Sequence, residues 1–160
     1  MKFIIKISML LGCLFFLLGN GDAVQAHINN RQIAIGGMTP GCNAAYTEKI
    51  YGKPLQETVV QADTGETFIE YNYGGKLVVG FTAKNGQACY ISCTANNLKT
   101  PAGIAAGMRA DCLTRAYGKA DRYYTYKNKT LYIYNDRGGH TLSFDVKNFY
   151  IIRVNIRTLR

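Results

Sequence analysis

The sequence predicts an α+β protein made of two copies of one small unit, each a helical segment or helical hairpin packed on a four-stranded antiparallel sheet. Three observations lead to this fold class: an internal repeat, helix start and stop signals at matching places in both copies, and short alternating strands separated by turn residues. One continuous eight-stranded sheet, rather than two sheets of four, stays open as an alternative.

Residues 1–26 are predicted to be a secretory signal peptide. A basic start and an apolar run over 7–18 precede small residues and a cleavage site between Ala26 and His27. The apolar run is short for a membrane span, so no transmembrane helix is expected in the mature chain. A lipoprotein signal with Cys13 lipidated is the weaker alternative, because five more apolar residues follow Cys13.

The internal repeat appears when the two halves of the mature chain are aligned. Gly37 and Gly41 match Gly103 and Gly107, an offset of 66 residues, and Tyr-Gly-Lys at 51–53 matches 117–119. Further along, the offset becomes 63, and the matches are Tyr71 with Tyr134, Phe81 with Phe144, and Lys84-Asn85 with Lys147-Asn148. The repeat divides the chain into a signal peptide (1–26), a first unit (27–98) and a second unit (99–160).

Each unit is expected to begin with a helix. Threonine followed by proline, at 39–40 and again at 100–101, is typical of an N-cap and the first helical position. Gly52 and Gly118 occupy the place just after a helix end, where a left-handed cap favours glycine. The helices are therefore expected to run from these Thr-Pro pairs to the residues before the two glycines.

Four turn segments at 74–75, 84–86, 138–139 and 147–149 separate the predicted strands. Alternation along the strands assigns one set of apolar side chains to the face covered by the helices. That set is Phe81, Cys89, Ile91 and Cys93 in the first unit, and Phe144, Ile152, Val154 and Ile156 in the second. The opposite, helix-free face carries Tyr90, Arg153, Asn155 and Arg157.

Four cysteines remain once the signal peptide is removed. An even number in an exported chain predicts two disulfides, with four buried thiols as the alternative. Cys89 and Cys93 are four residues apart on one predicted strand, which separates their Cα atoms by roughly 13 Å. Since a disulfide tolerates about 7 Å, each would join a helix cysteine, Cys42 or Cys112, and both combinations stay open.

Charge is unevenly distributed between the two units. Residues 27–100 carry six Lys and Arg against five Asp and Glu, whereas residues 101–160 carry eleven against four. A basic second unit favours anionic partners such as lipid head groups, cell-wall polymers or an acidic protein. Export argues against nucleic acid as a partner.

Residues that could carry out catalysis are few. The chain has only two histidines, His27 and His140. His140 and Ser143 are three apart on one predicted strand and so face opposite sides, which argues against a Ser-His pair. Lone carboxylates such as Glu70 and Asp145 are expected to be solvated. The sequence predicts no catalytic residues, no metal ligands and no cofactor, and we expect a protein that is not an enzyme.

Two short motifs resemble those of a known group of envelope proteins. Residues 107–120, and the matching 41–54, are similar to the signature of SmpA/OmlA (BamE-type) outer-membrane assembly lipoproteins and of the units of the β-lactamase inhibitory protein. Residues 124–126 and 144–148 also resemble a family of exported Gram-positive proteins of unknown function. The resemblance implies a helical hairpin over a four-stranded sheet, repeated twice. The chain departs from the signature at Cys42, Thr47 and Ala120.

These observations lead to a functional hypothesis. We expect a non-catalytic exported module, in the periplasm, the cell envelope or the secreted fraction, that contacts a protein or an anionic envelope polymer through the helix-free face. Tyr90, Arg153, Asn155 and Arg157 are its candidate contact residues. The alternative is a secreted inhibitor of an extracellular β-lactamase or protease, and a cell-wall hydrolase is a distant third. The oligomeric state stays open.

Overall fold

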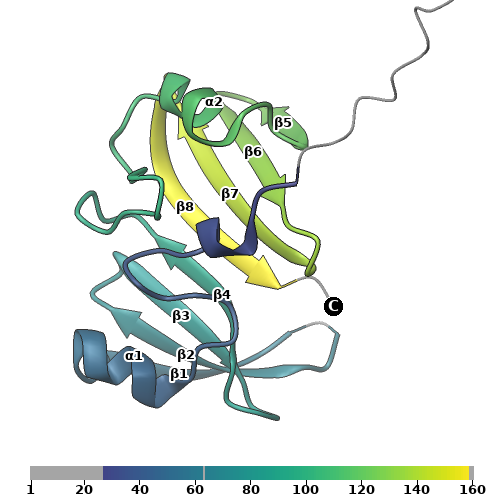
Figure 1. The fold of residues 1–160 in the computed structure, drawn as a ribbon. Coiled ribbons are helices and arrows are strands. Elements are labelled where there is room, and N and C mark those ends of the chain that lie inside the picture. Colours follow the sequence, from purple (N-terminus) through teal and green to yellow (C-terminus); the bar gives the residue numbers. More distant parts are fainter. Residues whose placement is uncertain (1–26, 63, 159–160) are drawn as a thin grey trace, which may run out of the picture.

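Eight antiparallel strands form one continuous sheet, and two short helices lie on one of its faces (Figure 1). The computed structural model describes residues 27–62 and 64–158, so the predicted signal peptide with Cys13 lies outside the described residues. The elements are, in chain order, the 3-10 turn η1 (Asn30–Gln32), α1 (Ala44–Tyr51), β1 (Gln56–Gln61), β2 (Thr67–Tyr73), β3 (Leu77–Thr82), β4 (Ala88–Cys93), α2 (Asp111–Tyr117), β5 (Arg122–Tyr126), β6 (Lys129–Asn135), β7 (His140–Lys147) and β8 (Tyr150–Thr158).

The predicted fold class is wrong. Each described unit has one short helix instead of a helical hairpin, and helices make up 14% of the structure. The strands do not form two separate sheets of four either. They hydrogen-bond side by side in the order β1-β2-β3-β4-β8-β7-β6-β5, so the structure is mostly a single sheet.

Glycines explain why the helices are shorter than predicted. Gly41 and Gly107 have φ values of 80° and 88°, which a helix cannot contain. The Thr-Pro pairs before them therefore lie in turns, and α1 begins only after Asn43, whose side chain accepts a hydrogen bond from the Tyr46 N–H at 2.8 Å. Both helices end before a glycine with positive φ, as their positions predict, at Gly52 and Gly118.

The repeat is visible as a local two-fold relation between the two halves of the sheet. Ser92 and Asn155 are equivalent residues at the offset of 63, and they lie directly opposite each other where β4 pairs with β8. An antiparallel pairing of equivalent strands places a local two-fold axis at this pair. The axis accounts for the symmetrical strand order, which leaves β1 and β5 as the two edges.

Two β-bulges correct the predicted alternation. Phe81 pairs with Ala88 while Gly80 pairs with Tyr90, so Cys89 is an extra residue in β4. Ile152 is the extra residue at the equivalent place in β8. Alternation assumes an unbroken ladder, so it assigned these two residues to the covered face. The places next to the core are instead taken by Ala88 and Ile151, which are 3% and 1% exposed.

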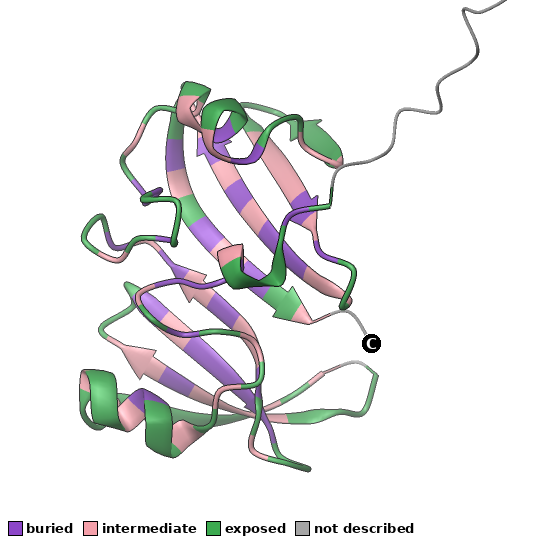
Figure 2. Ribbon diagram, in the orientation of Figure 1, coloured by how far each residue is buried: buried purple, intermediate pink, exposed green. Residues whose placement is uncertain are grey.

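The core lies between the sheet and the three segments that cover it, which are α1, α2 and the chain before α1. Buried residues are purple in Figure 2. Leu113 and Tyr117 of α2 pack against strand residues such as Tyr134 and Phe144. Between the two helices, the chain before α1 crosses the sheet in extended form (Figure 1) and contributes Ile28, Ile33, Ile35 and Met38, all at most 7% exposed. No helix among the described residues is long and apolar enough to cross a membrane.

The two predicted disulfides are not formed. Among the described residues, Cys42, Cys89, Cys93 and Cys112 make no disulfide bond. The Cys93 sulfur is buried and contacts the Ala95 carbonyl oxygen at 3.8 Å, and the Cys89 sulfur lies 3.3 Å from the Gly80 carbonyl oxygen. The prediction assumed that both strand cysteines face the helices, and the bulge at Cys89 breaks that assumption.

Candidate binding face

The face of the sheet opposite α1, α2 and η1 carries polar and charged side chains. We term this surface the open face, and its centre consists of Tyr90 and Ser92 on β4 with Arg153, Asn155 and Arg157 on β8. Across the two strands Tyr90 lies opposite Arg157, and Ser92 lies opposite Asn155. The structure thus brings together the four residues predicted from sequence as contact residues, Tyr90, Arg153, Asn155 and Arg157.

The open face is hollowed across its central strands. A hollow of about 460 Å³ lies over β5–β8, lined by Arg122, Tyr124, Ile133 and others, and a second of about 310 Å³ lies over β2–β4 and β8. Both are lined by the three β8 residues Arg153, Asn155 and Arg157, so the two hollows meet at β8. Their volumes fall within the range of about 300–1,000 Å³ that is usual for ligand sites.

Tyr90 forms a fixed wall of the hollow over β2–β4 and β8. Its ring lies over Gly80, where an added Cβ atom would overlap the ring, and its hydroxyl donates to Glu70 Oε2 at 2.7 Å. Phe68 meets the same ring edge-on, with the centroids 6.1 Å apart. Burial, together with the hydrogen bond to the Glu70 carboxylate, raises the pKa of Tyr90 far above its usual value. Tyr90 is therefore neutral and held in place.

Three arginines of the open face have no acidic partner. Among residues 27–62 and 64–158, the ion pairs are Arg109 with Asp111 and His140 with Asp136, so none involves Arg122, Arg153 or Arg157. Asp145 lies opposite Arg153 across β7 and β8, but its carboxylate accepts a hydrogen bond from Asn155 Nδ2 at 3.4 Å. The hollow over β5–β8 therefore holds three arginines against one carboxylate, Asp145, and keeps a net positive charge.

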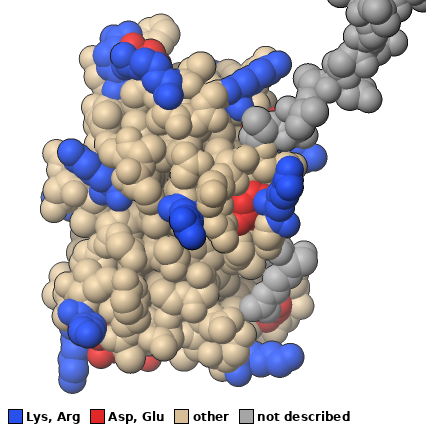
Figure 3. Space-filling view, viewed as in Figure 1, with Lys and Arg blue, Asp and Glu red and all other residues tan. Residues whose placement is uncertain are grey.

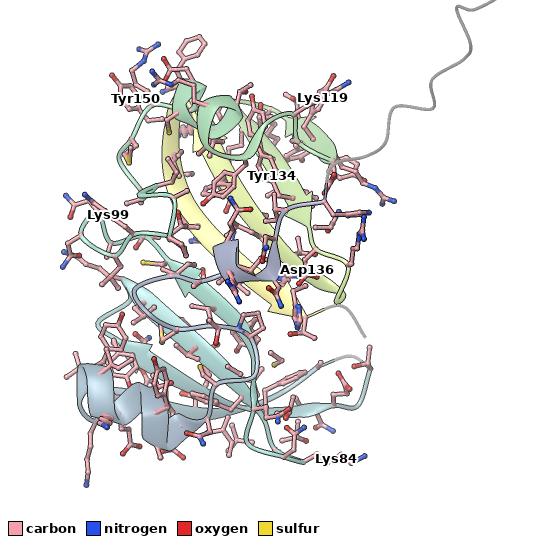
Figure 4. The ribbon with its side chains drawn as sticks, viewed as in Figure 1. Lys84, Lys99, Lys119, Tyr134, Asp136 and Tyr150 are labelled. Atoms are coloured by element: carbon pink, nitrogen blue, oxygen red, sulfur yellow. The ribbon has the colours of Figure 1, made fainter. Side chains whose placement is uncertain are left out.

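The covered face differs in its charge pattern. Figure 3 shows that it is formed mostly by residues other than Lys, Arg, Asp and Glu, with basic side chains scattered around it. Lys99 and Lys119, labelled in Figure 4, lie far from each other at its margins. The grouped arginines are thus a feature of the open face.

The side chains tested for catalysis from sequence lie in different places. Ser143 is on the open face, while His140 bonds through Nδ1 to Asp136 Oδ2 at 2.8 Å and lines a separate hollow. The Ser92 hydroxyl donates to Asn155 Oδ1 at 2.9 Å. In the described part of the chain, no group of three or more His, Cys, Asp or Glu side chains is arranged to hold a metal ion.

Sequence reasoning missed two features. Arg122 lies on the open face because β5 pairs with β6. Arg122 and Tyr124 are two residues apart on one strand and so share a face, and this spacing could have predicted the position of Arg122. The bonded pair Asp136 and His140 was also missed. An aspartate four residues before a histidine, with Gly138-Gly139 between them, indicates a tight turn that can bring the two side chains together.

Comparisons with known proteins identify the fold alone. No protein-family model and no curated protein sequence matches the chain. The uncharacterized protein YfeY from Escherichia coli is 16% identical, with a TM-score of 0.50 over 79% of this chain and 97% of that chain. An extracellular protein containing an SCP domain from Bacillus anthracis is 8% identical, with a TM-score of 0.46 over 73% of this chain. The present chain spans 43% of that protein's length.

Proposed function

We propose that the protein is a non-catalytic, exported binding module that contacts a protein or an anionic envelope polymer through its open face. The observation that carries the proposal is the group of three arginines, Arg122, Arg153 and Arg157, that line a hollow and have no ion-pair partner among the described residues. Arginine presents a planar fork of donors that matches carboxylate and phosphate groups.

The two halves of the open face support different contacts. The half over β5–β8 holds the arginines together with polar side chains such as Asn135 and Thr141. The half over β1–β4 adds a further hollow with apolar side chains, Val60, Phe68 and the Tyr90 ring, in its lining. A partner that fits both halves presents anionic groups to β8 and apolar groups to Tyr90.

Export rests on the predicted signal peptide, and it places the module where anionic polymers of the envelope are abundant. The binding role does not depend on which envelope compartment receives the protein. Binding to the open face requires only that the face stay uncovered, and no segment among the described residues packs over it (Figure 1).

The experiment compares two triple variants that remove the same amount of charge. The first variant replaces Arg122, Arg153 and Arg157 by Ala. The second replaces Lys49, Lys99 and Lys119 by Ala, and these three lysines lie away from the open face. Binding to immobilised poly-glutamate and poly(glycerol phosphate) is measured at about 0.15 M salt. At roughly 0.2–1 kcal/mol per exposed charge pair, the arginine variant is expected to bind about tenfold more weakly.

The lysine variant is expected to bind nearly as well as the unmodified protein. Replacing Tyr90, Arg153 and Arg157 together by Ala is also expected to abolish capture of partners from an envelope extract, while the fold stays intact by circular dichroism. Equal losses in the two charge-matched variants would show that binding follows net charge alone and would contradict the proposal.

A further inference from the structure

Both histidines of the chain line one hollow of about 370 Å³ at the end of the β6–β7 hairpin, apart from the hollows of the open face. His27 comes from the start of the described chain and His140 from the first position of β7. Asp136 lies in the hairpin turn, beside η1, as labelled in Figure 4. Two imidazoles from distant parts of the sequence therefore share one surface depression.

Ile28 fixes the chain next to His27. Its backbone N–H donates to the Asn135 carbonyl oxygen at 3.0 Å, and its side chain is 7% exposed. The following residue, Asn29, caps η1 by accepting from the Arg31 N–H at 2.9 Å. Consecutive Cα atoms are about 3.8 Å apart, so the amine and imidazole of His27 are one residue from an anchored point beside Asp136.

His140 is oriented by a buried carboxylate. Asp136 Oδ2 lies 2.8 Å from His140 Nδ1, and Asp136 Oδ1 accepts from the backbone N–H groups of Gly138 and His140, each at 2.8 Å. An ionised Asp136 accepts the Nδ1 proton, which leaves the Nε2 lone pair of His140 available to a ligand. A carboxylate behind an imidazole in this way is the usual second layer of a histidine metal site.

We propose that the mature N-terminus binds one Cu(II) ion through the α-amine and the imidazole of His27 together with Nε2 of His140. The proposal rests on signal-peptide cleavage after Ala26, because only that cleavage creates a free amine on His27. The amine and the imidazole of one residue close a chelate ring, and His140 supplies the third nitrogen. The side chains of His27, His140 and Asp136 do not by themselves form a three-ligand cluster, so the site requires the amine.

The donor set selects the metal. Ca²⁺ and Mg²⁺ need several oxygen ligands, and the one carboxylate in this hollow, Asp136, is already occupied by His140 and Gly138. Arg137 also lines the hollow. A neutral set of amine and imidazole nitrogens binds Cu(II) most tightly among the divalent first-row metals.

The test titrates Cu(II) into the folded chain that begins at His27, followed by calorimetry and electron paramagnetic resonance. We expect one ion per chain and nitrogen hyperfine coupling from three donors. The first control carries an acetyl group on the His27 amine, which converts the amine to an amide and leaves the fold untouched. The second is His140→Gln. Each is expected to bind Cu(II) at least about tenfold more weakly.

Two further measurements separate this site from simpler chelation. A peptide of residues 27–32 has the amine and the His27 imidazole but lacks His140, so it is expected to bind as weakly as His140→Gln. Binding by the peptide, the acetylated chain or His140→Gln that equals binding by the unmodified chain would overturn the proposal. So would an intact mass of the secreted protein that places its N-terminus anywhere but His27.

Discussion

Ser92 and Asn155 are equivalent residues of the two units, 63 positions apart, and they meet at the centre of the sheet with the Ser92 hydroxyl donating to Asn155 Oδ1 at 2.9 Å. Their strands, β4 and β8, make the central contact between the halves of the sheet. The pair thus marks both the local two-fold axis and the contact that turns two sets of four strands into one sheet.

Replacing Ser92 by Ala is expected to lower the free energy of unfolding by about 1 kcal/mol, because Asn155 Oδ1 loses its donor while half-buried. Urea denaturation measures the change. Ser143→Ala is the matched control, since Ser143 flanks Asn155 on the other side and its hydroxyl makes no hydrogen bond among the described residues. Equal effects of the two substitutions would contradict the role given to the Ser92 hydroxyl.

The cysteines are expected to behave as four thiols. Alkylation of the mature chain in denaturant, without reductant, should modify all four, because the structure contains no disulfide among them. In the native protein Cys93 should resist modification, since it is 0% exposed and burial raises the pKa of its thiol. Mass spectrometry counts the modified cysteines. Two that become reactive only after reduction would indicate a disulfide.

The repeat allowed much of the local structure to be predicted from sequence. Turn residues marked the strand ends, and glycines marked both helix ends, because these signals act within a few residues. The grouping of Tyr90 with Arg157 also followed from alternation, which holds along any regular strand. Features whose backbone geometry depends on neighbouring residues could therefore be predicted from this one sequence.

Features that depend on pairing between strands were not predicted. Nothing local to Cys89 or Ile152 shows that each is an extra residue, because a bulge is a property of two strands together. The joining of β4 to β8 is likewise a contact between residues far apart in the chain. The Thr-Pro signals predicted longer helices, which the positive φ at Gly41 and Gly107 rules out.

Acid should destabilise the protein partly through Asp136. Burial alone would raise the pKa of this carboxyl, but hydrogen bonds from His140 and Gly138 outweigh burial and hold the pKa below its usual value. A lowered folded-state pKa contributes stability that is present above the unfolded value of about 4 and is lost as the pH falls below it. Asp136→Asn should therefore flatten the fall in melting temperature below about pH 4, at some cost in stability at neutral pH. An unchanged acid profile would contradict this.

Gly80 and Tyr90 should be coupled in stability. A Cβ atom at residue 80 would overlap the Tyr90 ring, so Gly80→Ala displaces the ring from the sheet and breaks the bond to Glu70, at a cost of about 1–3 kcal/mol. In a protein that already carries Tyr90→Ala the same change meets no ring, and its cost should fall to a few tenths of a kcal/mol. A double-mutant cycle by urea denaturation measures this difference. If the costs of Gly80→Ala and Tyr90→Ala simply add, the position of the Tyr90 ring does not depend on the absence of a side chain at residue 80. A large coupling would show that a glycine in β3 sets the position of the tyrosine wall on the open face, and Gly80→Ala should then weaken partner binding as well.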